Sequence, residues 1–122
     1  LQKENVKIIL TGSQEEKKKY EALENLEGID SSLGLLSLFE LISLIQHADI
    51  LLAHSTGPLH IGAFAKIKTL GLYPCGKNIN EKRWGPLGDK SIILSEAITH
   101  KKDKDLRSIK VSTVKQKLKK WL

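Results

Sequence analysis

The feature that most constrains the fold is the stretch 48–62, in which a short apolar run meets a Ser-Thr-Gly-Pro turn. The run has the length of a buried strand, and the residues after the turn favour a helix. With Gly57 as N-cap and Pro58 as the first helical residue, the N–H groups of Leu59 and His60 would be free at the positive end of that helix. A strand, turn and helix in this order are typical of anion sites in α/β proteins, and a phosphate would fit there.

The same order of elements recurs along the chain. Strands are predicted at residues 6–10, 27–32, 50–53, 69–73 and 92–94, and helices at 14–25, 38–46, 58–65 and from Ser112 to the end. Ser13 with Glu16, and Ser37 with Glu40, have the spacing of a capping box. Strands that alternate with helices predict an α/β fold, a Rossmann-like parallel sheet with right-handed crossovers and helices on both faces.

Two turns that contain glycine, 11–13 and 55–57, each follow a predicted strand. Because parallel strands end at the same edge of a sheet, both turns are predicted on one rim, where ligands bind. The second turn offers two hydroxyls and a glycine that permits close approach of the backbone, which suits a diphosphate. Serine and threonine before a helix are also common as plain caps, and His60 can be a structural histidine or a ligand contact.

Length and composition set the class of protein. At 122 residues the chain is predicted to form one domain, and because it contains no methionine we expect an excised piece of a longer protein. No apolar run reaches the ~18 residues that a membrane span needs. The lone Cys75 cannot form an internal disulfide, which favours a reducing, cytosolic setting.

The net charge of +6 is concentrated at one end of the chain. Residues 101–122 hold nine basic and two acidic residues, whereas residues 1–100 hold eleven basic and twelve acidic ones. Such a tail can be a solvated face, or it can be attracted to anionic lipid or another polyanion. The long loop 74–89 is of the kind that is functional or mobile, and its Trp84 could stack on a base or hold the loop to the body.

Four segments, taken in order, resemble the C-terminal domain of the family 9 glycosyltransferases, the ADP-heptose lipopolysaccharide heptosyltransferases and their relatives. The segments are Leu-Thr-Gly-Ser at 10–13, Leu-Gly and Ser-Leu within 33–38 with the helix and strand that follow, Ser-Thr-Gly-Pro-Leu-His at 55–60, and Arg-Trp-Gly-Pro-Leu-Gly at 83–88. The resemblance runs from about Val6 to Leu94.

That resemblance implies a two-domain GT-B enzyme. Residues 1–122 would be a single domain that binds the nucleotide sugar, with 101–122 as a basic C-terminal segment ending in a helix. A missing N-terminal domain would bind the lipopolysaccharide-type acceptor and supply the catalytic base, so no catalytic residue is expected in this chain. The resemblance also implies a metal-independent, cytoplasmic enzyme without a cofactor, and a donor such as ADP-heptose. Peripheral contact with the anionic inner membrane is expected through the basic tail 101–122.

The resemblance also implies which residues contact the donor. Thr56 and Gly57 would hold the diphosphate, Ser55 would face the sugar, and His60 would lie close by. The residues expected near the ribose and the base are Thr11, Gly12, Ser13, Gln14, Ser37 and Leu38.

Two departures from the family pattern leave the donor sugar open. Ser55 stands where the family usually has an aspartate, which removes a charged acceptor for sugar hydroxyls. Leu35 and Leu36 stand where the family has a basic residue and a threonine, which removes a polar contact near the nucleotide. The alternative function is a non-catalytic α/β module whose basic tail binds an anionic partner. Nucleic acid is a poor fit for that partner, because the six aromatic residues do not alternate with the lysines.

Overall fold

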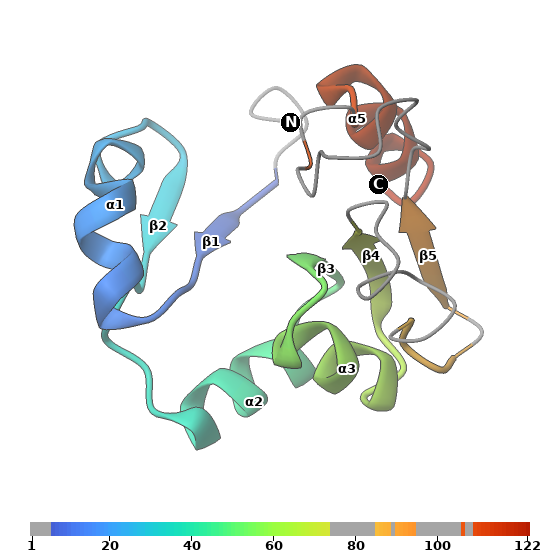
Figure 1. The fold of residues 1–122 in the computed structure, drawn as a ribbon, viewed down its shortest axis with the longest axis horizontal. Coiled ribbons are helices and arrows are strands. Elements are labelled where there is room, and N and C mark those ends of the chain that lie inside the picture. The colour runs from blue at the N-terminus through green and yellow to red at the C-terminus, as the bar shows by residue number, and fades with distance from the viewer. Residues whose placement is uncertain (1–5, 74–84, 89, 95–105, 107–108) are drawn as a thin grey trace, which may run out of the picture. The chain divides into compact units, whose positions relative to one another are not determined.

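The computed structural model describes residues 6–73, 85–88, 90–94, 106 and 109–122 (Figure 1). The chain forms two compact units, residues 1–43 and residues 44–122. The expectations for Cys75, for Trp84 and the rest of 74–84, and for the tail residues 101–105 lie outside the described part. None of the helices in the described part is long and apolar enough to cross a bilayer.

The first unit contains two parallel strands and the helix between them. Its elements are β1 (Ile8–Leu10), α1 (Gln14–Glu24), β2 (Ile29–Ser31) and the first part of α2 (Leu38–Gln46). The strands pair with Ile8 opposite Ile29. The hydroxyl of Ser31 donates to the Glu24 carboxylate at 2.7 Å, which ties the end of α1 to β2.

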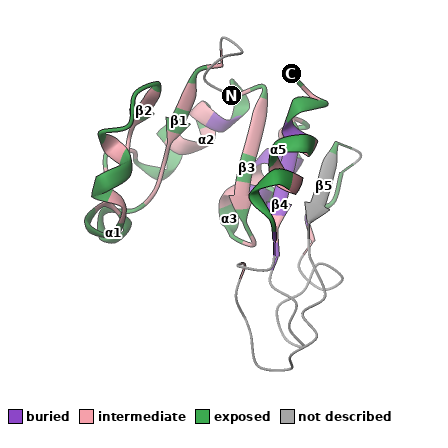
Figure 2. Ribbon diagram, turned by 90° about the horizontal axis from the view of Figure 1, so that it is seen from above, coloured by how far each residue is buried: buried purple, intermediate pink, exposed green. Residues whose placement is uncertain are grey.

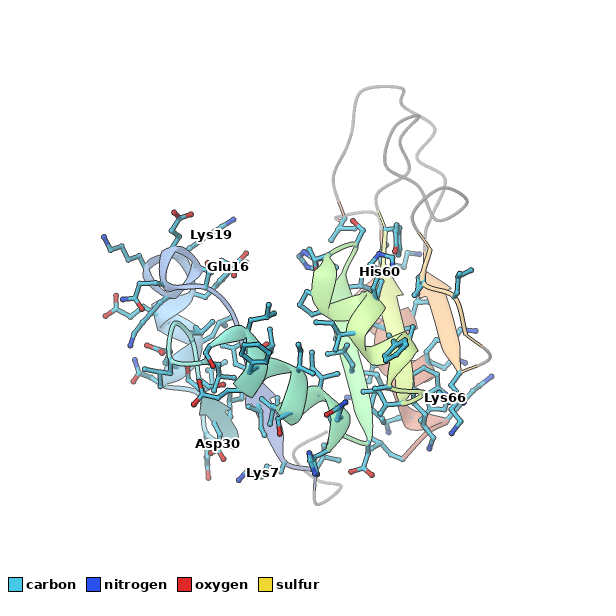
Figure 3. All side chains as sticks on the ribbon, turned by 90° about the horizontal axis from the view of Figure 1, so that it is seen from below. Lys7, Glu16, Lys19, Asp30, His60 and Lys66 are labelled. Carbon is cyan, nitrogen blue, oxygen red and sulfur yellow. The ribbon has the colours of Figure 1, made fainter. Side chains whose placement is uncertain are left out.

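The second unit is a three-stranded parallel sheet with helices on both faces. Its elements are β3 (Ile50–His54), α3 (Gly57–Phe64), β4 (Lys68–Leu72), β5 (Ser91–Leu94) and α5 (Val111–Lys119), and the strand order is β3-β4-β5. Helix α3 packs on β3 and β4. In Figure 3, which views the molecule from below, α3 lies in front of the sheet and α5 behind it. In Figure 2, which views it from above, α5 lies in front and α3 behind.

The core of the second unit is centred on the middle strand. Leu59, Thr69, Leu70 and Tyr73 are at most 1% exposed, and Figure 2 shows the buried residues along β4. Strand β4 is apolar along most of its length because both of its faces and both of its edges are covered. On the opposite face of the sheet, α5 contributes the buried Leu118.

The predicted fold class is confirmed: the chain is α/β, and all of its described strands pair in parallel. Each predicted strand and helix is present, within about two residues at most ends. The hydrogen bonds divide the strands between two sheets, β1-β2 and β3-β4-β5. Since the turns 11–13 and 55–57 belong to different units, their placement on one rim stays a prediction.

Two helix starts differ from the prediction. The N-cap of α3 is Thr56, which is extended at φ −134° and ψ 172°, and Gly57 is already helical. The N-cap of α5 is Lys110, two residues before the predicted Ser112. The Lys110 carbonyl accepts hydrogen bonds from the N–H groups of Thr113 and Val114, at 2.9 and 3.3 Å, so backbone bonding rather than a serine side chain begins this helix.

Candidate functional site

The turn between β3 and α3 is closed by two hydrogen bonds to one carbonyl. The N–H of Thr56 donates to the His54 carbonyl oxygen at 2.7 Å, and its hydroxyl donates to the same oxygen at 3.3 Å. No side-chain bond from Thr56 caps the helix. The plain-cap interpretation is therefore wrong for Thr56, whose hydroxyl oxygen keeps its capacity to accept a hydrogen bond.

The start of α3 differs in part from the prediction that the N–H groups of Leu59 and His60 are both free. The N–H of Leu59 donates to the Thr56 carbonyl at 3.1 Å, so it is not available to a ligand. Pro58 has no N–H, and Gly57 occupies the first helical position, whose N–H has no partner within a helix. The N–H of Gly57 therefore lies at the positive end of α3 in place of that of Leu59, and the free N–H of His60 stays a prediction.

Gly57 faces open space. Apart from its chain neighbours and its own helix backbone, no heavy atom in the described part of the chain lies within 4 Å of a Cβ built on it, and its φ is not positive. Neither packing nor backbone geometry therefore requires a glycine here. The position leaves room for a group from outside to approach the backbone.

Helix α3, which follows this turn, is packed on the sheet through a buried leucine. Leu59, one turn into α3, is fully buried, and its side chain occupies the space above Gly71 of β4. A Cβ on Gly71 would lie 2.7 Å from the Leu59 Cδ2 atom. This contact sets the height of α3 above the sheet, so the turn before it has a defined position.

The other members of this turn are open to solvent to different degrees. Thr56, Gly57 and His60 are exposed, and Ser55 is half-buried. Figure 3 shows His60 on α3, toward the carboxyl ends of the strands. Tyr73 follows β4 at the same end of the sheet, and burial raises the pKa of its hydroxyl. The structure thus brings Ser55, Thr56, Gly57 and His60 together around one helix start.

In the first unit, the turn after β1 is tightly packed. Ser13 and Glu16 form the predicted capping box: the Ser13 hydroxyl accepts the Glu16 N–H at 3.3 Å, and the Glu16 carboxylate accepts the Ser13 N–H at 2.7 Å. The cap of α1 thus uses the N–H of Ser13 as a donor and its hydroxyl oxygen as an acceptor. Thr11 and Gly12 are half-buried, and Gln14 is exposed.

A second turn, which the sequence did not single out as structural, lies against the first. The N–H of Gly34 donates to the Gly12 carbonyl at 2.9 Å, and Gly34 has a φ of 69°. A Cβ on Gly34 would collide with the Gln14 side chain. The signal for this role is the Leu-Gly pair after a strand, because glycine is the residue that tolerates positive φ.

Ser37 is the cap of α2. Its hydroxyl donates to the Glu40 carboxylate at 2.6 Å and accepts the Glu40 N–H at 3.3 Å, and its own N–H donates to the same carboxylate at 2.7 Å. These bonds hold the pKa of Glu40 below its usual range. Leu38 is 63% exposed and Leu35 is 67% exposed, so the segment offers apolar surface rather than polar contacts.

The candidate donor residues fall into two groups. Those at 55–60 lie in the second unit and those at 11–14 and 37–38 lie in the first. Their assembly into one site stays a prediction. Among the described residues, no group of three or more His, Cys, Asp or Glu side chains is arranged to hold a metal ion.

Comparisons with known proteins connect this geometry with a family. Residues 1–112 match the model of glycosyltransferase family 9 (heptosyltransferase). A protein of Haemophilus influenzae named "Putative glycosyltransferase" is 32% identical over 88 residues, which cover 67% of this chain and 25% of the relative.

Two solved structures share the fold. The glycosyl transferase family 9 protein of Veillonella parvula superposes with a TM-score of 0.76 and 16% identity, over 93% of this chain and 35% of that one. The E. coli heptosyltransferase WaaC with ADP superposes with a TM-score of 0.78 and 17% identity. The match covers 96% of this chain and 34% of that one. The chain spans about a quarter to a third of the length of these relatives. With its α/β fold of the GT-B type and a family match over nearly its whole length, the chain belongs to glycosyltransferase family 9.

Proposed function

We propose that this chain is the part of a glycosyltransferase that binds the donor, a nucleotide diphosphate sugar. The observation that carries the proposal is the start of α3, where the Gly57 N–H lies at the positive end of a helix and the described residues leave open the space that a Gly57 side chain would fill. Membership of a glycosyltransferase family supports it, and so does the structural relative that was solved with ADP.

In this proposal the second unit holds the diphosphate. The N–H of Gly57 and the hydroxyl of Ser55 or Thr56 contact the phosphate oxygens and the adjoining sugar, and the exposed His60 contributes a further donor. Thr11, Gly12 and Gln14 approach the ribose, and Leu38 lies against the base. The cap of α1 uses the Ser13 hydroxyl as an acceptor, so this hydroxyl can still donate to the ligand, whereas the hydroxyl and the N–H of Ser37 both donate to Glu40.

The reaction of the whole enzyme would be direct displacement at the anomeric carbon. A base from the part of the protein outside this chain activates the acceptor hydroxyl. The diphosphate leaves with negative charge, which the fixed N–H dipoles at the start of α3 stabilise. We propose that this step needs no metal ion, since neutral donors and the helix dipole bind the leaving group.

The proposed substrates follow the family. The donor is an ADP-sugar such as ADP-heptose, and the acceptor is the core of a lipopolysaccharide or a similar surface glycan. Ser55 has a neutral hydroxyl at the sugar end of the site, so it selects the donor by hydrogen bonding without charge. A lipid-linked acceptor places the enzyme in the cytoplasm, at the inner face of the membrane.

The donor site is tested by titrating the full-length protein with ADP in a calorimeter. Gly57→Val fills the open space, so we expect binding to weaken at least tenfold while the unfolding temperature stays within a few degrees. The control is Phe64→Ala at the other end of α3, where the Phe64 side chain is 85% exposed. This substitution should alter neither ADP binding nor the unfolding temperature. The site assignment is wrong if ADP, UDP and GDP and their sugars show no saturable binding, or if Gly57→Val binds like the natural protein.

A further inference from the structure

The amino ends of the strands in the second unit carry a group of lysines. Lys66 precedes β4, Lys68 begins it, and Lys90 precedes β5. The N–H of Thr69 donates to the Lys90 carbonyl at 3.1 Å, which brings the two strand starts together. Figure 3 shows Lys66 at the opposite end of this unit from His60, so these lysines lie away from the candidate donor site.

The last turn of α5 reaches the same end of the sheet. The Lys68 ammonium donates to the Trp121 carbonyl oxygen at 2.9 Å, which places the end of the helix beside the start of β4. This contact adds the lysines of the last helical turn to those of the strand starts. We call the combined set the basic edge; its members are Lys66, Lys68, Lys90, Lys117, Lys119 and Lys120.

Among the residues of the second unit that the structure describes, basic side chains outnumber acidic ones. They comprise eight lysines and one acidic residue, Asp49, which precedes β3. Charges that lie within a Debye length of one another, about 8 Å at physiological salt, act jointly on an anionic partner. Three separate chain segments contribute to the edge, so it is an end face of the unit rather than one stripe along a helix.

Lys66 occupies a position that glycine suits better. It has a φ of 60°, and it follows α3 in a Schellman motif: its N–H donates to the Ala63 carbonyl at 3.1 Å, and the N–H of Ile67 donates to the Gly62 carbonyl at 3.2 Å. This C′ position is usually glycine, because other residues are strained there. Lysine at this position makes the folded chain less stable than glycine would. We take this as an indication that the charge of Lys66 serves an interaction with another molecule.

We propose that the basic edge docks the protein on the surface of an anionic lipid bilayer. The proposal rests on the peripheral membrane location proposed above for its choice of partner, and it names the surface that makes the contact. Trp121 is half-buried and Leu122 is 54% exposed at the same end of α5. Lysines mixed with tryptophan and leucine are typical of surfaces that contact lipid headgroups.

A bilayer fits these residues better than a nucleic acid does. Proteins that bind single strands place several aromatic side chains along a basic groove, whereas Trp121 is the one aromatic residue in the described part of α5 and its flanks. Duplex readers insert a free helix into a groove. Helix α5 instead packs Leu118 into its own unit, where this side chain is 7% exposed.

The test is co-sedimentation of the full-length protein with vesicles. Vesicles that contain phosphatidylglycerol should bind the protein, with binding that weakens as salt rises, and pure phosphatidylcholine vesicles should not. Lys66→Gly should weaken binding about fivefold, the share expected of one lysine at an anionic surface. The same substitution should raise the melting temperature, so the loss cannot come from unfolding. Lys18→Gln, the same change of charge on α1, is the control and should bind like the natural protein.

The proposal is overturned if Lys66→Gly and the triple variant Lys66→Gly, Lys68→Gln, Lys90→Gln bind these vesicles as tightly as the natural protein. It is also overturned if duplex or single-stranded DNA binds more tightly than the vesicles and displaces them. ADP titration separates this proposal from the donor site: the triple variant should bind ADP normally, and Gly57→Val should bind vesicles normally.

Discussion

At the scale of single residues, three glycines of the second unit have different surroundings. A Cβ on Gly62 would lie 2.6 Å from the Leu51 Cδ2 atom and 3.0 Å from the Thr69 hydroxyl oxygen, and Gly71 is equally crowded. Gly57 has open space instead. Close packing of the core therefore requires glycine at the first two positions, whereas packing of the described residues makes no such demand at Gly57.

Substitution of these glycines should separate packing from binding. Gly71→Ala places a methyl group against Leu59 and Tyr73, which are at most 1% exposed and cannot easily move. We expect a loss of about 1–3 kcal/mol in the free energy of unfolding, measured by urea denaturation. Gly57→Ala is the matched control and should leave that free energy unchanged within about 0.5 kcal/mol. Equal losses in the two variants would contradict this account of the site.

At the scale of elements, α1 and α2 begin in the same way. Ser13 with Glu16 and Ser37 with Glu40 form reciprocal capping boxes, as the sequence spacing predicted. Such caps depend on four consecutive residues, so they can be recognised without the tertiary structure. The starts of α3 and α5 lack a side-chain cap, and these are the two that the sequence analysis misplaced.

The α2 cap should make this helix sensitive to acid. The hydroxyl of Ser37, and then its N–H, stabilise the ionised Glu40 carboxylate and lower its pKa in the folded chain. The stabilising contribution is therefore complete above the unfolded pKa of Glu40, and it is lost as the pH falls through the lowered folded pKa. In an NMR titration, Ser37→Ala should move the Glu40 pKa upward. Ser13→Ala removes the other cap and should leave the Glu40 pKa in place; a Glu40 pKa unmoved by Ser37→Ala would contradict the assignment.

At the scale of the whole molecule, α5 is the element that joins the end of the chain to the sheet. Leu118 is 7% exposed and Ile109 is 9% exposed, whereas Val111 is 82% exposed on the same helix. The bond from the Lys68 ammonium to the Trp121 carbonyl completes the attachment. Apolar burial is the stronger of the two effects, because the bond lies at the surface and competes with water.

The attachment of α5 can be measured with a pair of substitutions on one helix. Leu118→Ala removes a buried side chain and leaves a cavity, so we expect a loss of about 2–5 kcal/mol in the free energy of unfolding. Val111→Ala removes an exposed side chain and should change it by less than about 0.5 kcal/mol. Both values come from chemical denaturation of the full-length protein. If Leu118→Ala is as stable as Val111→Ala, then α5 is not packed on the sheet as described.

The sequence by itself determined the order and type of the elements, the two capping boxes and the position of the Ser-Thr-Gly-Pro turn. These features depend on residues that are close together in the chain, such as Ser37 with Glu40, so local spacing is enough to predict them. The resemblance to family 9 glycosyltransferases also rested on such short segments, and the family match confirmed it.

Only the tertiary structure decided which groups at that turn are available and which are used. The bonds from Thr56 to the His54 carbonyl and from Leu59 to the Thr56 carbonyl depend on the backbone path of the turn, which spacing does not specify. The crowding around a Cβ on Gly71, and its absence around a Cβ on Gly57 among the described residues, depend on how α3 packs on β4. The basic edge likewise exists because Lys68 and Trp121, 53 residues apart, meet in the folded chain.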